Sequence, residues 1–365
     1  MYPLERFLTA SKLKFADYVP ASPFITGHFI LWFAGIPEDK AFEYWGRDYK
    51  KKLYAQLKTI RAFEGFPDVM IWPGVWADFG PAVETSALGC NIIYPSRSSP
   101  FPEPAVKKVD DIDRLRVPDP RKDGLMPLAI EAYTYMAKNV PCELREQYGY
   151  GQWTHALGPS DIAGLSMGYD KFLIGIYRYP DSIQRLMKVA AETTVLWIEA
   201  QRDAIGSDLL TFISGDTDCF LNPEQFRTFS YPHIRYVCKR LKRRGKIVLY
   251  HNDGNTTHLL DKLRDIGANM FNYGQRMSTA TVKEKVGEKM ALIGGLNSIG
   301  ILLRGKPEEV EEESKKAILE GGIDGGFVLS NEGGMAAHTP WENILAMINS
   351  AAKYGKYPII SNEKR

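Results

Sequence analysis

The sequence predicts an α/β fold, a (β/α)8 barrel in which eight parallel strands alternate with helices. Three observations support this prediction. Short apolar runs recur along the chain, amphipathic stretches lie between most of them, and 365 residues is a length at which such a barrel forms one domain. An open doubly wound sheet is the alternative. No Gly-x-Gly-x-x-Gly follows an apolar run, however, so nothing favours a dinucleotide-binding version of it.

The expected strands are the eight apolar runs. In chain order they span 22–29, 67–72, 142–148, 208–216, 246–251, 268–273, 290–297 and 324–332. Helical patterns between them include 180–206 and 307–322, which begin with proline and end with glycine. The connections after the first strands are long, and 91–106 is rich in proline. We expect one domain over 1–365, with an N-terminal extension over about 1–20.

Composition argues against several classes of partner. A net charge of +2 gives no electrostatic reason to expect nucleic acid or a lipid surface as a partner. The four cysteines are scattered without a Cys-x-x-Cys, which suits a reducing compartment. The N-terminus lacks the apolar core of a signal peptide, and no run approaches the roughly 20 apolar residues of a membrane span. These features predict a cytoplasmic protein.

In a barrel of this kind, the active site lies at the carboxyl ends of the strands. Polar and aromatic side chains collect there in the predicted arrangement. They are His28, Trp72, Trp76, Asp78, Gln147, Tyr148, Asp216, Asp218, His251, Asp253, Asn272, Gln275, Asn297, Asn331 and Glu332.

His251 and Asp253 are two residues apart and point to the same side if the fifth strand is still extended there. With Glu332, and with Asp216 or Asp218, they form a hard nitrogen and oxygen ligand set for zinc, manganese or iron. A hydrogen-bonded polar cluster without a metal explains the same residues equally well. The sequence does not tell which of Asp216 and Asp218 faces the pocket.

Asp78 lies among tryptophans, where a carboxyl with a raised pKa could act as an acid or base, or cap a helix. Aromatic side chains near the strand ends predict a flat apolar substrate, although such residues also form ordinary core. The expected substrate-binding residues are His28, Trp72, Trp76, Tyr148, Trp153 and Asn297.

Four segments carry a resemblance to a known family, namely 158–187, 221–237, "LYHNDGN" at 249–255 and the glycine-rich ending 325–357 with "HTPWEN". The sequence resembles the uroporphyrinogen decarboxylase superfamily and, within it, the cobalamin-dependent methyltransferases, in particular the methyltransferase components of O-demethylases. The resemblance covers nearly the whole chain and implies a barrel with an extended N-terminal part.

Two departures from the family pattern bear on function. The decarboxylases carry an arginine-rich N-terminal motif that binds substrate carboxylates, and 23–45 has no arginine. Porphyrinogen decarboxylation is therefore disfavoured, although Asp78 lies near the position of the family's catalytic aspartate. The thiol-methylating branch has His-x-Cys and a second cysteine as zinc ligands. Here His251 is kept, Asp253 and Gly333 stand at the cysteine positions, and Glu332 is the nearest substitute.

The resemblance therefore implies transfer of a methyl group from an O-methyl donor, best a methoxylated aromatic compound, to cob(I)alamin on a partner corrinoid protein. This is a reaction of anaerobic one-carbon metabolism. We expect His251, Asp253, Glu332 and Asp78 to be catalytic, and the first three to hold zinc if a metal is present. Methanol, a methylamine or a methylthiol as donor, a lyase of the decarboxylase type and a non-catalytic barrel are the alternatives. A homodimer is compatible with the sequence, which does not fix the oligomeric state.

Overall fold

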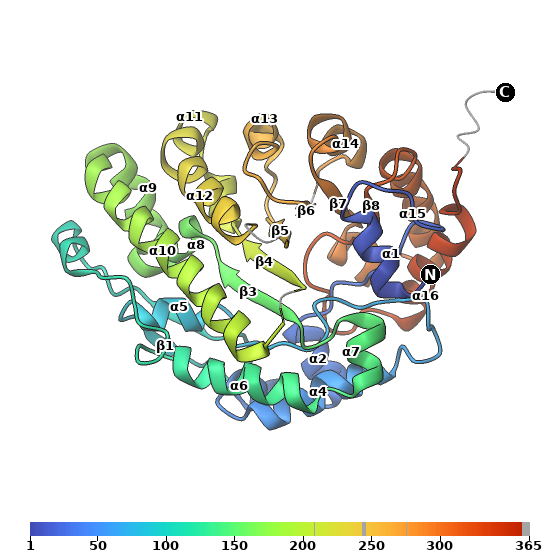
Figure 1. Ribbon diagram of the computed structural model, residues 1–365, viewed down its shortest axis with the longest axis horizontal. Helices are drawn as coiled ribbons and strands as arrows, with labels where there is room; N and C mark the ends of the chain where they lie inside the picture. The colour runs from blue at the N-terminus through green and yellow to red at the C-terminus, as the bar shows by residue number, and fades with distance from the viewer. Residues whose placement is uncertain (208, 243–245, 275, 360–365) are drawn as a thin grey trace.

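A computed structural model describes residues 1–207, 209–242, 246–274 and 276–359. Its centre is a parallel sheet whose strands follow one another in chain order, each bonded to the next (Figure 1). The strands are β3 (Trp153–Leu157), β4 (Leu210–Ser214), β5 (Ile247–His251), β6 (Met270–Asn272), β7 (Ala291–Leu296) and β8 (Phe327–Asn331). A separate antiparallel pair, β1 (Asn91–Ile93) and β2 (Phe101–Glu103), lies in the proline-rich connection.

Two extended segments supply the first two positions of the barrel. The backbone N–H of Leu329 in β8 donates to Pro20, and that of Ser22 donates back to Leu329, both at 2.9 Å. The N–H of Trp72 donates to Pro23, again at 2.9 Å, in a parallel arrangement. These segments therefore continue the sheet beyond β8, and the (β/α)8 prediction is confirmed. Prolines interrupt the ladder because they have no N–H to donate, so neither segment becomes a regular strand.

Helices surround the sheet (Figure 1). They are α1 (Pro3–Ala10), α2 (Gly27–Ala34), α3 (Phe42–Trp45), α4 (Tyr49–Arg61), α5 (Ala82–Ala87), α6 (Met126–Asn139), α7 (Cys142–Tyr148), α8 (Pro159–Met167), α9 (Tyr169–Arg178), α10 (Pro180–Ile205), α11 (Pro223–Gln225), α12 (Tyr231–Leu241), α13 (Leu260–Leu263), α14 (Thr279–Val286), α15 (Pro307–Gly321) and α16 (Trp341–Tyr354). Shorter turns are η1 (Glu38–Lys40), η2 (Val109–Arg114), η3 (Asp216–Phe220), η4 (Phe226–Ser230), η5 (Thr257–Leu259) and η6 (Ser298–Leu303).

The long helix α10 illustrates how the sequence sets these boundaries. Pro180 occupies its first turn, where the missing N–H costs nothing, and Gly206 ends it in the left-handed conformation at φ 66°. Its apolar face includes Leu186 and Ile198, which are fully buried. None of the described helices is both long and apolar enough to cross a membrane.

Two strand predictions are wrong in detail. The run 142–148 is helix α7, and the third strand is the next apolar stretch, β3. Pro141 before this run and Gly149 after it, at φ 72°, are helix boundary signals, and its charged residues suit an exposed helix. The run 22–29 leaves the extended conformation early, because α2 begins at Gly27. Asp208 and Gln275 lie outside the described residues.

Candidate active site

A cavity of about 380 Å³ lies at the carboxyl ends of β3, β4 and β5, where the barrel architecture places active sites. Its floor is formed by His251, which ends β5, together with Asp216 and Asp253 from the turns that follow β4 and β5. The carboxylates keep about half of their surface exposed, 43% for Asp216 and 53% for Asp253, whereas His251 is buried. The two acids therefore face the open side of the cavity.

The three side chains form a compact cluster. Nε2 of His251 lies 3.1 Å from Oδ1 of Asp253 and 3.7 Å from Oδ1 of Asp216. The backbone N–H of Asp253 donates to the same oxygen of Asp216 at 2.7 Å. The sequence left the choice between Asp216 and Asp218 open, and Asp216 is the one that lines the cavity. Asp218 instead accepts a hydrogen bond from buried Tyr250 at 2.7 Å.

Asn272, at the end of β6, fixes the orientation of the histidine. Its Nδ2 donates to the Ile293 carbonyl at 2.8 Å, so its Oδ1 must be the atom 2.6 Å from Nδ1 of His251. Nδ1 therefore carries a proton and donates it to Asn272, while Nε2 faces the two carboxylates. This is the arrangement in which Nε2 can bind a metal or, when protonated, act as an acid.

Asp161, in the first turn of α8, holds the turn that carries Asp216. Its carboxylate accepts hydrogen bonds from the backbone N–H groups of Asp216 at 3.1 Å and Thr217 at 2.7 Å, and from Oγ of Ser214 at 2.7 Å. Sequence reasoning missed this residue. Its position in the first turn of a helix is ordinary for an aspartate and gave no functional signal.

The protonation of the cluster follows from burial and the paired charges. Burial disfavours the charged imidazole, but Asp253 and Asp216 outweigh it and raise the pKa of His251 to about 9. Partial burial and the neighbouring carboxylates of Asp161 and Asp253 also raise the pKa of Asp216, against the attraction of His251. In the protein without a metal, the cluster therefore holds a proton on His251 at neutral pH.

One ligand atom from each of Asp216, His251 and Asp253 can be chosen so that all three lie within 4.8 Å of one another. One nitrogen and two carboxylate oxygens are a donor set that suits zinc, manganese or iron(II). The oriented Nε2 meets the requirement for a second-sphere partner of a metal-bound histidine. These residues fit a divalent ion, with Asp216 rather than Glu332 as the third ligand.

Aromatic rings form one wall of the cavity. The ring of Phe212 lies between those of His155 and His251, with centroids 5.1 and 5.2 Å away, and Trp76 packs on His155 at 4.7 Å. Burial lowers the pKa of His155 to about 3, so this second histidine is neutral. Phe24 and Phe212 were missed by sequence reasoning because apolar residues within extended segments look like ordinary core.

The remaining predicted substrate residues are distributed around this wall. His28, on α2, and Trp76 line the cavity. Trp153 lines a smaller apolar pocket that shares Trp76, His155 and Phe212 with it, and Trp72 is buried behind Phe24, with the rings stacked at 3.8 Å. Tyr148 does not line this cavity, since it ends α7 and its hydroxyl donates to Pro67.

Asp78 is buried beside the cavity rather than in its lining. Its carboxylate accepts hydrogen bonds from Tyr44 at 3.2 Å and from the backbone N–H of Gly80 at 3.1 Å. Burial raises its pKa to about 6, against the attraction of buried Lys52. Gly80 itself lines the cavity, so Asp78 could act on a substrate only through its neighbours.

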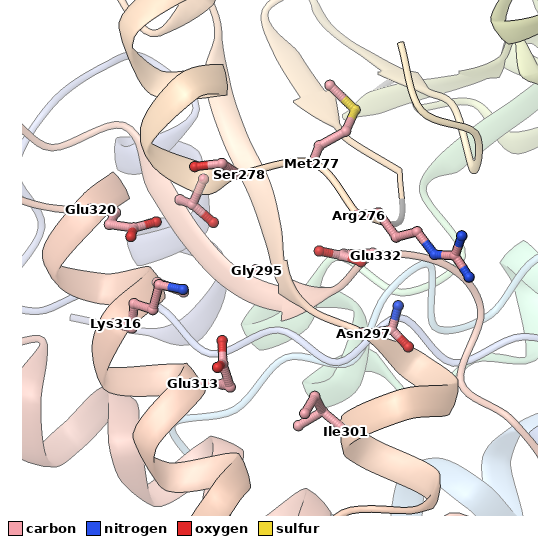
Figure 2. A pocket seen from close by; sticks show the side chains of 12 residues that line it. Arg276, Met277, Ser278, Gly295, Asn297, Ile301, Glu313, Lys316, Glu320 and Glu332 are labelled. Atoms are coloured by element: carbon pink, nitrogen blue, oxygen red, sulfur yellow. The ribbon is translucent and has the colours of Figure 1, made fainter. Parts of the chain in front are cut away.

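Glu332 and Asn297 line a different cavity (Figure 2). The residue that faces the cluster is the next one along the chain, because a Cβ on Gly333 would lie 2.9 Å from Oδ1 of Asp253. Burial raises the pKa of Glu332 to about 8, against hydrogen bonds from Asn297 and the Arg276 backbone. The structure thus brings His251 and Asp253 together as expected but separates Glu332 from them.

The cavity also lacks arginine and lysine. Its lining, within the described ranges, contains neither residue, and the one histidine that holds a proton, His251, is already paired with Asp216 and Asp253. A substrate with several carboxylates would therefore find no arginine or lysine to pair with there. The aromatic wall and the acidic floor instead suit a flat, largely apolar molecule with one polar end.

Comparisons with known proteins place the chain in a family. The sequence profile described as Uroporphyrinogen decarboxylase (URO-D) matches residues 4–354. A methylcobamide:CoM methyltransferase (MtaA) of Methanosarcina barkeri is 24% identical over 280 residues, covering 73% of this chain and 76% of the relative. A uroporphyrinogen decarboxylase of Pseudoalteromonas atlantica is 23% identical over 273 residues, covering 73% and 75%.

A solved structure shares the fold. It is described as a methyltransferase from Methanosarcina mazei and superposes with a TM-score of 0.78 at 22% identity, covering 97% of this chain and 99% of the other. The match supports the barrel fold. Because the methyltransferase and decarboxylase relatives are almost equally similar, overall identity does not choose between their reactions, and the site residues must do so.

Proposed function

The chain belongs to the uroporphyrinogen decarboxylase (URO-D) family, and we propose that it is a corrinoid-dependent methyltransferase that demethylates an O-methyl donor. The observation that carries this proposal is the His251–Asp253–Asp216 cluster at the floor of a cavity without arginine or lysine in its described lining. Methylcobamide methyltransferases among the relatives support corrinoid chemistry, and the acceptor would be cob(I)alamin on a partner corrinoid protein.

The donor we favour is a methoxylated aromatic compound. The rings of Phe24, Trp76 and Phe212 offer faces and edges against which a flat ring can pack. A phenolate is also a better leaving group than an alkoxide, so an aryl ether needs less assistance than methanol. The polar floor would then meet the ether oxygen while the aromatic wall holds the ring.

The transfer forms a cobalt–carbon bond and breaks the carbon–oxygen bond of the ether, leaving negative charge on the oxygen. Cob(I)alamin supplies the nucleophile, and a divalent ion held by Asp216, His251 and Asp253 would supply Lewis acidity toward that oxygen. In the metal-free site, Nε2 of His251 carries the proton that the leaving oxygen needs. Asn272 holds the ring so that this nitrogen, rather than Nδ1, faces the cavity.

Other readings have less support. The thiol-methylating relatives use two cysteines according to the family pattern, and here Asp253 and Gly333 stand at those positions. Oxygen ligands suit an oxygen substrate better than a thiol. A lyase acting on a polycarboxylate would need arginine or lysine to pair with the substrate, and the described lining contains neither. Methanol or a methylamine could be the donor with the same cluster, and an experiment distinguishes these donors from a methoxyaromatic compound.

The test follows cob(I)alamin directly. The purified protein is mixed anaerobically with cob(I)alamin, or with a reduced corrinoid protein, and with methoxyaromatics, methanol or methylamines in turn. Loss of the cob(I)alamin absorption band is recorded for each donor, and metal content is measured in parallel. We expect conversion with methoxyaromatics. His251→Ala should abolish it, whereas His338→Ala, which removes an exposed histidine on another loop, is the matched control.

Each outcome decides something specific. Conversion with methanol or methylamines alone would keep the methyltransferase and overturn the aromatic donor. No conversion with any donor, given a corrinoid protein shown to be competent with another enzyme, would overturn the methyltransferase. Full activity of His251→Ala would overturn the role of the cluster.

A further inference from the structure

A second cavity, of about 280 Å³, lies beside the candidate active site at the carboxyl ends of β6, β7 and β8 (Figure 2). Its walls come from the loop 276–279, the end of β7, one face of α15 and Glu332 after β8. Gly334, two residues beyond Glu332, lines the active-site cavity instead. The short segment after β8 therefore has a side facing each cavity.

Glu332 is the least satisfied group in this second cavity. Its side chain is only 5% exposed, and Oε2 has no hydrogen-bond partner in the described part of the chain. Figure 2 shows the carboxylate turned into the cavity. A buried carboxylate oxygen without a donor is costly, and its position at a cavity indicates that a ligand with N–H groups completes it.

Charged side chains from α15 face Glu332. Glu313, Lys316 and Glu320 line the cavity from this helix, and Figure 2 shows the ends of Glu313 and Lys316 turned toward the space in front of Glu332. Among the ion pairs of the described residues, none joins Lys316 to Glu313 or to Glu320. Arg276 supplies a second cation at the wall near Asn297. The cavity therefore presents both acceptors and donors to a ligand.

A small metal ion does not fit this arrangement. Within the described ranges, the group of three acidic, histidine or cysteine ligands close enough to share an ion is the Asp216–His251–Asp253 cluster. The carboxylates of Glu313, Glu320 and Glu332 are too dispersed to converge on one ion. A molecule that spans the cavity can reach separate acceptors, and an anionic group on it would face Lys316, whose end is turned toward the same space.

We propose that the second cavity binds a small zwitterionic molecule of the amino acid type. Its ammonium group donates to Glu332 and Glu313, and its carboxylate pairs with Lys316. The ammonium group supplies the donor that Oε2 of Glu332 lacks, and the ligand carries its positive and negative charges at opposite ends. This site is distinct from the methyl-transfer cavity and does not depend on the function proposed for it.

Titration calorimetry with defined probes tests the proposal. Glycine, β-alanine and 4-aminobutyrate vary the distance between the charges, while methylammonium and acetate provide each half alone at equal ionic strength. We expect at least one zwitterion to bind more tightly than either half. Glu332→Gln and Lys316→Gln should each weaken that zwitterion by about tenfold or more, since each removes a charge-assisted hydrogen bond.

Matched controls use neighbours on the same helix. Glu312→Gln and Lys315→Gln change the same charges on exposed positions of α15 outside the cavity lining, and we expect unchanged binding. His251→Ala should bind the zwitterion as the unmodified protein does, which separates this site from the active-site cavity. Circular dichroism of each variant establishes that it is folded.

Several results would overturn the proposal. If methylammonium binds as tightly as every zwitterion, the ligand needs no anionic group and the zwitterion proposal is wrong. If only potassium or magnesium binds, the cavity is an ion site instead. No binding by any probe, or equal binding to folded Glu332→Gln, would refute it. None of these measurements uses a corrinoid, so failure here leaves the methyl-transfer assay unaffected, and the reverse also holds.

Discussion

The two cavities beside residues 331–334 use carboxylates in opposite ways. In the active-site cavity, Asp253 and Asp216 surround a histidine whose charge they stabilise, and the turns around them are held by hydrogen bonds. In the second cavity, Glu332 is more deeply buried and has an oxygen without a donor. The same functional group is thus part of a preassembled cluster in one cavity and incomplete in the other. The surroundings, rather than the residue type, set what each carboxylate can do.

The largest expected effect is the loss of methyl-transfer activity when a residue of the active-site cavity is replaced. His251→Ala removes the oriented nitrogen and should lower methyl transfer by about 10³-fold or more, because the site loses a metal ligand or, in the metal-free protein, its acid. The rate of cob(I)alamin loss, measured with a saturating donor, gives the effect. Thermal unfolding of the variant shows whether the barrel is intact.

Glu332→Gln in the same assay tests the expectation drawn from the sequence, which grouped Glu332 with His251. A loss of activity as large as that of His251→Ala would show that Glu332 takes part in methyl transfer, and would contradict its assignment to a separate cavity. A much smaller loss would agree with the separation seen in the structure.

Residue spacing explains how much of the site could be predicted. His251 ends β5 and Asp253 lies two residues later in the turn, and their side chains meet as the spacing predicted. The prediction for Glu332 was wrong by one residue. Glu332 was chosen as a substitute for a ligand at position 333, but these two consecutive residues after β8 face different cavities. Asp216 and Asp218 were not distinguished because a 3-10 turn, rather than a strand, follows β4.

The fold was predicted more completely than the site. Repeated apolar runs gave the strands from β4 to β8, since buried parallel strands are apolar along their whole length. The first half of the barrel was harder, because prolines break its first two segments and α7 is a short, largely polar helix that its pattern alone does not separate from a strand. The second cavity could not be foreseen, since it depends on how α15 packs against the end of β7.

A smaller effect concerns the support of the histidine. Asn272→Ala removes the acceptor for Nδ1–H of His251 and should lower activity or metal affinity by about 10- to 100-fold. Asn272→Asp keeps an acceptor oxygen and loses the same amide donor, so it should retain more activity than the alanine variant. Both variants lose the bond to the Ile293 carbonyl, and the difference between them reports the acceptor at Nδ1 together with the charge that Asn272→Asp adds. Equal activities would show that this hydrogen bond does not matter.

Cysteines can report which residue faces which cavity. The double variant Asp253→Cys with Gly333→Cys should bind zinc at least about tenfold more tightly, because two thiolates would join His251. Asp253→Cys with Glu332→Cys is the control, since residue 332 faces the second cavity. Zinc content and the thiolate absorption of the cobalt(II)-substituted protein measure the result. A gain in both pairs, or only in the control, would contradict the assigned directions.

The smallest expected effect is on the stability of the fold, and it tests whether Glu332, unlike the carboxylates of the active-site cavity, is protonated at neutral pH. Folding raises the pKa of Glu332 from its ordinary 4.5 to about 8, so between these values the folded protein holds a proton that the unfolded chain has released. Stability should therefore fall as pH rises from 4.5 to 8. Glu332→Gln cannot ionise, and its stability relative to the unmodified protein should increase across this range, by at most about 1.4 kcal/mol for each unit of the pKa shift, so its Tm should rise relative to that of the unmodified protein.

Unfolding scans at pH 5 and pH 8 measure this difference, with Glu312→Gln as the control for loss of one exposed carboxylate. The groups facing Glu332 are Glu313 and Lys316 from α15 and Arg276 from the loop before α14, and the Gln variant leaves all three in place. A pH-independent difference would mean that the carboxylate is already ionised and paired. Addition of the zwitterion should reduce the pH dependence, because an ammonium group beside Glu332 favours the charged carboxylate and supplies the donor that its Oε2 lacks.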